Sequence, residues 1–461
     1  MQENVVKVSE IINNRYDAYY YRKEFYELKE KLLNAEHKTI GQEFDVTKLA
    51  GFEYTKYFTP ENMMSNDSYI ALTSRNIQTE CLNLTNYITI DKTVADTFLT
   101  RSKLRKNDVV MSYTGEYRRA LLLDKDGFQL GPNICLLRVK EEELSSNKPQ
   151  FLSNYLNSTV GQKLLDREKT FSGQPTVAMS RIRELIIPTN PNIMRSVNIL
   201  MKNAYKQKKD KELQAKNLLA SIDDFVLDVL NIKLPQLKKE KAYTTQISNI
   251  LGSRLDPDYN QNYYQQLQIA MENVEVSKIV TLHGLISPQT VNTQNCDFIN
   301  YVDLGSIDED TNTINYKRIE NQNIPSRAKM HIAKGDFIFS GLAGSISSIA
   351  LVDRQLENMV ASTGFYVIKP SDEYNIAYLF ALFKTKFMQN LLVRHASGAV
   401  MPSISNIELK NIKIPLPSKD IQNKVANYVL ETIREAKSLQ KEANSGLERA
   451  KQEVEKILLG E

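Results

Sequence analysis

The residues that could do chemistry are few, and they lie far apart along the chain. Neither the histidines nor the cysteines have metal-ligand spacing, and no HExxH or CxxC motif occurs. No GxxxxGK[ST] loop is present, and no GxGxxG follows a strand. The pattern therefore favours neither a metalloenzyme nor a nucleotide-driven motor. The residues concerned are His37, His283, His331 and His395 with Cys81, Cys135 and Cys296.

Three short segments resemble chemical sites but have simpler structural interpretations. Asp256-Pro257-Asp258-Tyr259 resembles the Asp-Pro-Pro-Tyr motif of amino-methyltransferases, yet its third residue is Asp and no FxGxG-type cofactor loop occurs. Proline flanked by acidic residues is typical of a helix start. Residues 341–345 (GLAGS) resemble a phosphate-binding loop but lack its lysine, and the acidic run 308–310 predicts a solvated hairpin loop. A methyltransferase or nuclease built on degenerate motifs stays open as an alternative.

Composition indicates an ordinary globular protein of 461 residues, with 42% hydrophobic residues and a net charge of +4. This length allows two to four domains, at roughly 100–200 residues each. No apolar run reaches the ~18 residues that a membrane span needs. The N-terminus lacks an apolar signal core, and three separated cysteines are typical of a reducing compartment. We therefore expect a cytoplasmic protein without a membrane partner.

An internal repeat organises the chain. Residues 175–188 (PTVAMSRIRELIIP) match residues 402–415 (PSISNIELKNIKIP) at a shift of 227 (402 − 175). Asn107-Asp108 aligns with Gly335-Asp336 at a shift of 228 (336 − 108). A third block aligns at a shift of 239 (254 − 15), namely Arg15, Asp17, Tyr20 and Leu28 with Arg254, Asp256, Tyr259 and Leu267. Three blocks in one order predict two copies of a unit of about 230 residues.

Each copy predicts the same order of elements. An amphipathic helix opens the copy, short β-branched or aromatic runs bounded by turn residues follow, and then come one helix, a Gly-containing loop and a strand ending in Pro. A long helix closes the copy. The predicted helices cover 19–33, 149–168 and 191–236 in copy one and 259–274, 375–395 and 418–461 in copy two.

The two long helices have the apolar periodicity of a coiled coil. In the first, Val197, Met201 and Ala204 begin a 4,3 alternation that reaches Val229, interrupted by Lys208 and Lys211. The interruption indicates a loosely packed, solvated middle, with a partner-binding role as the alternative. We expect an α/β (α+β) protein in which two repeated β-rich domains, 1–190 and 237–417, are joined by two long helices, 191–236 and 418–461, forming an antiparallel coiled coil.

Basic residues gather at equivalent places in both copies, around the central β strands. Lys and Arg near loop ends neutralise phosphates, and Ser, Tyr and Arg side chains can read base edges. Double-stranded DNA is therefore the preferred ligand, although each charged run could also be a solvated face. The candidate DNA contacts are Ser74, Arg75, Arg101, Lys103, Arg105, Tyr113, Arg118 and Arg119 in copy one, with Arg327, Lys329, Ser340, Ser345, Ser347 and Arg394 in copy two.

Several blocks resemble the DNA-specificity subunits of type I restriction–modification systems. They are Gly335-Asp336 with the following Phe-Ile-Phe-Ser, Ser397-Gly398, and residues 412–425. In copy one, residues 69–77 resemble the first strand of a family target-recognition domain, and Asn107 stands where copy two has Gly. Together the resemblance covers nearly the whole chain.

The resemblance implies a subunit without catalysis of its own. Each β-rich domain would read one half of a bipartite DNA site, and the paired helices would dock two methyltransferase subunits. S-adenosylmethionine, ATP and Mg²⁺ would be held by partner subunits, which include restriction or translocase subunits in a full assembly, and no cofactor by this chain. The alternatives are a specificity subunit of a stand-alone methyltransferase or other phage-defence complex, and a scaffold that pairs two proteins without DNA.

Overall fold

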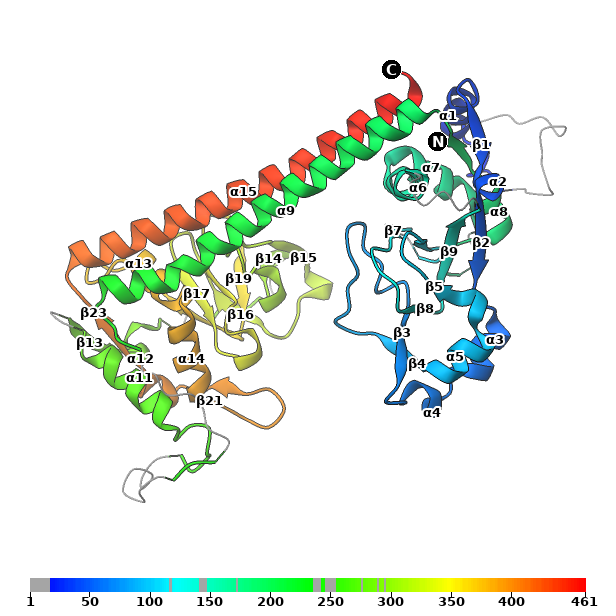
Figure 1. Ribbon diagram of the computed structural model, residues 1–461. Coiled ribbons are helices and arrows are strands. Elements are labelled where there is room, and N and C mark those ends of the chain that lie inside the picture. The colour runs from blue at the N-terminus through cyan, green and yellow to red at the C-terminus, as the bar shows by residue number, and fades with distance from the viewer. Residues whose placement is uncertain are drawn as a thin grey trace. The chain divides into compact units, whose positions relative to one another are not determined.

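The computed structural model describes residues 17–115, 118–140, 147–170, 173–234, 242–244, 254–274, 277–287, 290–293 and 296–461. The chain divides into two compact units. The first unit comprises residues up to Asp210 together with Glu442–Glu461, and the second unit comprises Lys211–Lys441. Both contain helices and sheets, and two long helices contribute to each (Figure 1). The predicted domain limits at residues 190, 236 and 417 stay predictions.

The first unit alternates short helices with short strands. Its helices are α1 (Lys23–Leu33), α2 (Ile40–Glu43), α3 (Gly51–Tyr57), α4 (Pro60–Met63), α5 (Lys92–Phe98), α6 (Lys148–Asn157), α7 (Thr159–Glu168) and α8 (Met179–Glu184). Its strands are β1 (His37–Thr39), β2 (Phe44–Lys48), β3 (Ser68–Leu72), β4 (Ile88–Asp91), β5 (Lys103–Leu104), β6 (Val109–Ser112), β7 (Ala120–Leu122), β8 (Phe128–Leu130), β9 (Ile134–Val139), β10 (Lys169–Thr170), β11 (Thr176–Val177) and β12 (Ile186–Pro188).

The second unit repeats this order with fewer short helices. Its helices are α11 (Asn262–Glu272), α12 (Leu282–Leu285), α13 (Ile376–Lys384) and α14 (Lys386–His395). Its strands are β13 (Lys278–Thr281), β14 (Phe298–Val302), β15 (Lys317–Glu320), β16 (Ala328–His331), β17 (Phe337–Ser340), β18 (Ile349–Leu351), β19 (Met359–Ser362), β20 (Phe365–Ile368), β21 (Ala396–Ser397), β22 (Ser403–Ile404) and β23 (Lys413–Leu416). Short 3-10 turns lie at 304–306, 321–323, 343–345 and 408–410.

The sheet topology confirms the repeat seen in the sequence. Each unit has an outer sheet, ordered β4-β3-β8-β5 in the first and β15-β14-β19-β16 in the second. In both outer sheets the two middle strands are parallel, and their other neighbours are antiparallel. Each unit also has an inner sheet, ordered β2-β9-β6-β7 or β18-β17-β20. A two-stranded pair, β1-β12 or β13-β23, joins the start of each copy to its end.

The central strands β6 and β17 are buried on both faces. Side chains alternate between the two sides of a strand. In β17, Phe337 and Phe339 belong to the core shared with the helices, whereas Ile338 belongs to a second cluster between the two sheets. In β6, Met111 and Val110 divide in the same way. This double burial explains why the Asp-hydrophobic-hydrophobic-hydrophobic-Ser runs are continuously apolar.

The prediction of one helix over 149–168 and one over 375–395 was wrong, because each is broken into two. Ser158 and Thr385 have extended backbone, and their hydroxyls accept hydrogen bonds from the backbone N–H groups of Gly161 and Met388. Ser and Thr are favoured as such N-caps because the side chain satisfies an N–H group that the helix leaves free. The two breaks are 227 residues apart (385 − 158), so the chain changes direction at the same point in both copies.

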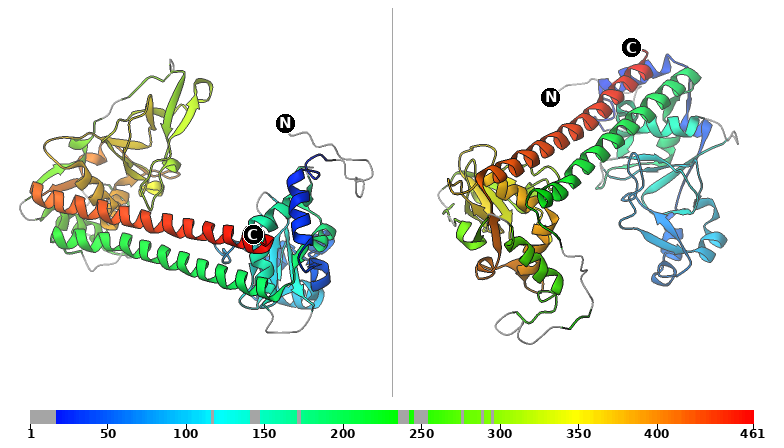
Figure 2. Two further views of the ribbon diagram at one scale, coloured as in Figure 1. Left: turned by 90° about the horizontal axis from the view of Figure 1, so that it is seen from above. Right: turned by 60° about the vertical axis from the view of Figure 1, so that its left-hand side comes forward.

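The long helices are α9 (Pro191–Val229) and α15 (Lys419–Leu459), and they pair antiparallel within each unit (Figures 1 and 2). In the first unit the start of α9, at Val197 and Met201, shares a core with the end of α15, at Val454. In the second unit the end of α9 meets the start of α15, where the rings of Phe225 and Tyr428 stack with centroids 3.5 Å apart. The expected fold class is confirmed.

The first long helix ends before the predicted residue 236. Asn231 has φ of 52°, and the backbone N–H of Ile232 donates to the carbonyl of Leu227 at 2.9 Å. A left-handed residue followed by such a bond is a common helix stop, and Asn adopts this conformation more readily than most residues. The helix therefore stops at its own local signal.

Candidate nucleic-acid interface

Loops at one end of the second unit are joined by main-chain hydrogen bonds into a continuous rim. Thr363 N–H donates to the Arg327 carbonyl, and Gly341 N–H donates to the Gly364 carbonyl, both at 2.9 Å. The hairpin β21-β22 completes this rim, because Ile404 N–H donates to the Gly341 carbonyl at 2.8 Å. We call residues 326–329, 341–345, 363–364 and 396–404 the second rim.

The first unit builds a similar rim from three corresponding loops, at 113–115, 131–133 and 173–177, and from the loop 73–76, which follows β3 and does not correspond to residues 326–329. Tyr113 N–H donates to the Asn133 carbonyl at 3.3 Å, and Val177 N–H donates to the Tyr113 carbonyl at 2.9 Å. Gly115 N–H donates to the Pro175 carbonyl at 2.9 Å, as Ala343 N–H does to that of Pro402. We call residues 73–76, 113–115, 131–133 and 173–177 the first rim. The two rims are thus built on the same scaffold.

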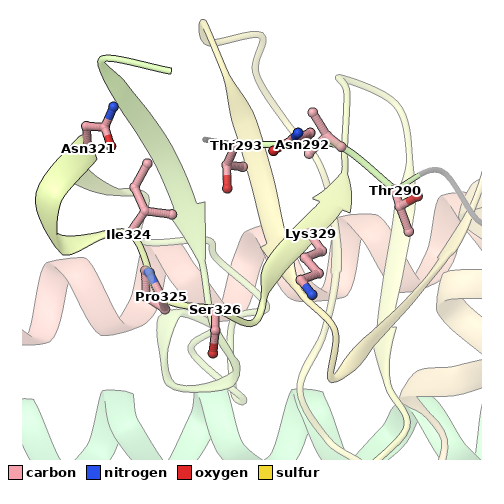
Figure 3. A pocket seen from close by; sticks show the side chains of 9 residues that line it. Thr290, Asn292, Thr293, Asn321, Ile324, Pro325, Ser326 and Lys329 are labelled. Carbon is pink, nitrogen blue, oxygen red and sulfur yellow. The ribbon is translucent and has the colours of Figure 1, made fainter. Parts of the chain in front are cut away.

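A concave surface of about 840 Å³, lined by both polar and apolar residues, lies beside the second rim (Figure 3). No carboxylate contributes to its described lining, and Lys329 is the charged side chain in it. A wall of hydroxyl, amide and ammonium groups suits a ligand that presents phosphates and hydrogen-bonding edges. The lining residues are Thr290, Val291, Asn292, Thr293, Asn321, Ile324, Pro325, Ser326 and Lys329.

The two predicted cations of the second rim are exposed. Within the parts of the chain that the structure describes, neither Arg327 nor Lys329 makes a side-chain ion pair; their backbone carbonyls accept from Thr363 and Val291 instead. Their charges are therefore available to a ligand. Ser345 and Ser347, also predicted contacts, are half-exposed beyond the end of β17.

The predicted contact Ser340 is buried and has a structural role. Its hydroxyl accepts a hydrogen bond from Leu342 N–H at 3.0 Å, which fixes the turn after β17. Ser112 does the same in the first unit by accepting from Arg119 N–H at 3.0 Å. Ser340 therefore supports the rim from inside rather than lying on its surface.

Two predicted cations of the first unit are held by the protein itself. Arg101 binds the buried carboxylate of Glu53 through two nitrogens, at 3.2 and 3.1 Å. Lys103 donates to Asp96 at 2.7 Å and to the Tyr69 hydroxyl at 3.2 Å. The hydrogen bond from Lys103 lowers the pKa of Asp96, and the same contact raises the pKa of Lys103. These cations are partly neutralised before any ligand arrives.

The adjacent pair Arg118 and Arg119 also points inward. Arg118 is among the largest fully buried side chains, and its guanidinium donates to Asp166 at 2.7 Å. Arg119 is half-buried and donates to the side chain of Gln78. Burial removes Arg118 from any surface that DNA can reach in this conformation.

The remaining predicted polar contacts of the first unit lie on or near its surface. Arg75 and Arg105 are exposed, and Ser74 is half-exposed. The loop that carries Ser74 and Arg75 is held by the buried Asn76, whose amide donates to the carbonyls of Asn83 and Asn86 at 2.8 Å. This fixed loop presents Arg75 to solvent.

The predicted contact Tyr113 has no tyrosine at its matching position in the second unit. The second unit instead carries a tyrosine, Tyr366, on the neighbouring strand. The backbone position of Tyr113 is that of Gly341, where an added Cβ would lie 2.6 Å from the Tyr366 ring. Tyr366 corresponds to Cys135, because they pair with Phe339 and Met111, which match in the repeat. A tyrosine therefore comes from one strand in the first unit and from its neighbour in the second. Burial raises the pKa of Tyr113 and raises that of Cys135 to about 12.

The predicted contact Arg394 packs inside the second unit. It lies over the Tyr259 ring at 4.5 Å and donates to the Tyr259 carbonyl at 2.9 Å. Arg167 makes the same pair of contacts with Tyr20 in the first unit, at 4.2 and 3.3 Å. The Asp-Pro-Asp-Tyr segment belongs to this arrangement, since Asp256 accepts from Tyr259 N–H at 3.0 Å just ahead of α11. The segment forms a turn ahead of the helix, which begins at Asn262 and not at the predicted Tyr259.

The lysines in the helix seam are not simply solvated. Lys208 is largely buried and binds Glu80, on the loop between β3 and β4, at 2.7 Å. Lys211 also makes contacts, so the middle of α9 is more firmly held than the pattern indicated. The prediction of a solvated middle was wrong for Lys208, because a polar loop of its own unit supplies the counter-ion.

The described residues hold no group of three or more His, Cys, Asp or Glu side chains that could bind a metal ion. Their helices include none long and apolar enough to cross a membrane. The acidic run 308–310 is exposed beside the bridge between Ile307 and Ile314, as predicted for a hairpin loop. The candidate site contains cations, hydrogen-bonding groups and a concave surface, which are features that suit binding of a ligand.

Sequence reasoning missed most of the concave surface in the second unit. Thr290, Asn292 and Ser326 line it, and none was predicted as a contact. The available signal was the run Thr290-Val-Asn-Thr-Gln-Asn295, whose polar side chains stand just ahead of strand β14. At the corresponding place the first unit has the short helices α3 and α4.

Residues 272–449 match the family model described as type I restriction modification DNA specificity domain. The type I restriction enzyme HindI specificity subunit of Haemophilus influenzae is 25% identical over 113 residues, covering 23% of this chain and 24% of that protein. The MjaIX specificity subunit of Methanocaldococcus jannaschii is 35% identical over 71 residues, 15% of this chain and 16% of that one. The EcoBI specificity subunit of Escherichia coli is 23% identical over 179 residues, 38% and 36%. The chain thus matches about a third or less of the length of these relatives.

Specificity subunits are also found among the solved structures that this chain resembles. The S subunit of a type I restriction–modification system from M. genitalium overlays on 92% of this chain and 95% of its own, with a TM-score of 0.43 and 15% identity. The HsdS subunit from Thermoanaerobacter tengcongensis overlays on 92% and 96%, with a TM-score of 0.37 and 14% identity.

The family match falls on the unit with the open polar surface and the unpaired cations. Residues 272–449, which include most of the second unit and most of helix α15, therefore resemble a type I restriction–modification DNA specificity domain. The resemblance to type I specificity subunits, which the repeat motifs indicated, is confirmed.

Proposed function

We propose that this chain is a non-catalytic DNA-specificity subunit of a type I restriction–modification complex. One observation supports this most: the second unit, which matches the specificity-domain family, presents Arg327 and Lys329 unpaired beside a concave surface whose described lining has no carboxylate. Phosphates attract such cations, and neighbouring hydroxyl and amide groups can read base edges.

In this proposal each rim reads one half of a bipartite site in double-stranded DNA. The rims use the same main-chain scaffold but carry different side chains, and therefore fit different half-sites. Arg75 and Arg105 are the contacts proposed for the first unit, with Arg327, Lys329, Ser345 and Ser347 for the second.

The paired helices α9 and α15 are proposed to dock two methyltransferase subunits. S-adenosylmethionine, and in a complete restriction assembly ATP and Mg²⁺, are then held by those partners and by restriction or translocase subunits. This chain contributes the recognition of the DNA sequence. A specificity subunit of a stand-alone methyltransferase would use the same surfaces.

Two substitutions in the second rim test the proposal. The recognised sequence is first found by mapping N6-methyladenine in cells that contain this chain and the methyltransferase encoded beside it. The complex is then titrated with that duplex at several salt concentrations. Arg327→Ala with Lys329→Ala weakens binding about tenfold or more, and it lowers the slope of log K against log salt by about two, since each lost phosphate contact contributes ~0.9.

The matched control is Lys334→Ala, an exposed lysine at the opposite end of β17. It leaves affinity and slope nearly unchanged. Scrambling one half of the duplex at a time assigns the lost contacts to the second half-site. A complex that binds no duplex, or a chain that assembles with no methyltransferase, rejects the proposal.

A further inference from the structure

The hairpin β21-β22 carries a strongly exposed apolar tip. Val400 is 91% exposed and Met401 is 57% exposed, and the two are neighbours on one hairpin. Ile407, 74% exposed, follows just after the hairpin. Apolar side chains presented on a protruding loop usually mark a contact with another molecule.

The surroundings of this tip favour a polyanionic partner over a basic one. Residues 396–407 contain no Asp or Glu, and the next carboxylate, Glu408, is buried against His395 at 2.7 Å. No negative charge on the hairpin itself therefore opposes approach to phosphates. The exposed cation Arg327 belongs to the same rim, through the Thr363-Gly364 turn and Gly341.

The hairpin is held rigidly enough to project its tip. Pro402 accepts a hydrogen bond from Ala343 N–H at 2.9 Å, and the Tyr366 hydroxyl donates to the Ile404 carbonyl at 2.6 Å. Gly398 turns the chain with φ of 127°, a conformation that other residues rarely adopt. Pushing the tip into a ligand would therefore cost little ordering of the loop behind it.

In the first unit, the two positions that match Val400 and Met401 carry no apolar side chain. Gly173 and Gln174 stand where the second unit has Val400 and Met401, at the repeat shift of 227 (400 − 173). A glycine and a polar amide can approach bases but cannot displace them from their stack. Among the residues that the structure describes, an apolar pair at these two positions thus belongs to the second rim.

We propose that Val400 and Met401 act as a wedge that enters between neighbouring base pairs of the second half-site and opens the stack. Apolar side chains inserted at a base step unstack it and kink the duplex, and the cost is lowest at flexible pyrimidine–purine steps. The second half-site is then read partly by its deformability, and the first by direct contacts. This inference rests on the proposed DNA-binding function.

The test uses the complex with its methyltransferase and duplexes carrying 2-aminopurine at single positions, excluding the adenines that become methylated. Wild-type complex raises the fluorescence at one step of the second half-site at least twofold, and it raises none in the first. The variant Val400→Gly with Met401→Gln copies the residues of the first unit. It abolishes the signal and weakens binding less than tenfold.

The control variant is Ile407→Gln, which removes an exposed apolar side chain outside the hairpin and keeps the fluorescence signal. Normal binding without any fluorescence change in wild type rejects the wedge and leaves the proposed function standing. Loss of methyltransferase assembly in the hairpin variant, with an unchanged signal in what remains, identifies the tip as a protein contact and also rejects it. Failure of wild type to bind any duplex rejects the proposed function itself.

Discussion

The two outer sheets have the same strand order but are covered differently. In the first unit, α3, α4 and α5 lie around the sheet, and Phe58, Ala95 and Leu99 form a small core with it. In the second unit the described residues at the matching places include 290–293 and the 3-10 turn 321–323, and both line the concave surface. The inner sheet and its helices need buried faces on both sides, so their pattern repeats. The segments that pack against the outer sheet do not need a second buried face, so they can vary with the ligand.

The same contrast holds for charge. The predicted cations Arg101, Lys103 and Arg118 of the first unit are paired with carboxylates, whereas Arg327 and Lys329 of the second form no ion pair with any residue that the structure describes. A cation with a partner stabilises its own domain, and a cation without one is ready for a ligand. Position in the repeat therefore does not decide the role of a basic residue; its nearest carboxylate does.

The largest expected effect separates these two kinds of cation. Arg118→Ala lowers the free energy of unfolding of the first unit by about 2–3 kcal/mol, because it removes a buried side chain and its ion pair with Asp166. Arg327→Ala changes stability by less than ~0.5 kcal/mol, since Arg327 is exposed. Urea titration of both variants measures the difference. Equal stabilities would contradict the contrast.

The different placement of the tyrosine ring, at Tyr113 in the first unit and at Tyr366 in the second, gives the next largest effect on stability. Gly341→Tyr forces a second ring against Tyr366 and destabilises the second unit by about 2 kcal/mol. Tyr366→Cys also destabilises it, by removing a half-buried ring and its hydrogen bond to the Ile404 carbonyl. The double variant recreates the pairing of Tyr113 with Cys135, so it is at least ~1 kcal/mol more stable than the two single effects predict. Simple additivity in thermal unfolding would show that the two positions are independent.

A smaller, pH-dependent effect on stability distinguishes helix α14 of the second unit from its counterpart in the first unit, helix α7. Burial lowers the pKa of His395, opposed by its hydrogen bond to Glu408, with Arg394 and Arg254 nearby adding to the lowering. Because the unfolded chain takes up this proton first, the second unit is unaffected above pH ~6.5. Below it, stability falls by up to about 1.4 kcal/mol per pH unit.

The first unit has no histidine at the matching position, where Glu168 lies 3.8 Å from Arg181. Its stability should stay flat between pH 6.5 and 5 by comparison. His395→Gln removes the slope from the second unit, and urea titrations from pH 5 to 7.5 measure it. A slope that survives in His395→Gln would assign the titration to another group.

The sequence predicted the repeated scaffold well because the scaffold is local and periodic. The buried strands, the Pro-ending strand and the seam from Val197 onward are all visible as patterns of apolar residues. The breaks at Ser158 and Thr385 were missed because a hydroxyl inside an apolar helix pattern can point outward or cap a new helix. Only tertiary packing decides between these outcomes.

The candidate contacts were less predictable because a residue type does not reveal its partner. Arg118 and Arg119 are neighbours in sequence, yet one is fully buried on Asp166 and the other lies against Gln78. Lys208 appeared to weaken the helix seam, but its counter-ion, Glu80, is 128 residues away. Interactions of this range cannot be read from one sequence by spacing.

The composition of the first unit has a consequence for the order of synthesis. Its core includes Leu447, Ala450 and Val454 from the end of α15, packed with Val197 and Met201 from the start of α9. A ribosome makes residues 1–210 first, but the core of this unit stays incomplete until residues 442–461 have also emerged. A chain truncated before residue 442 would expose that apolar stripe to chaperones and proteases. The first unit thus completes its core only after the second unit has been made.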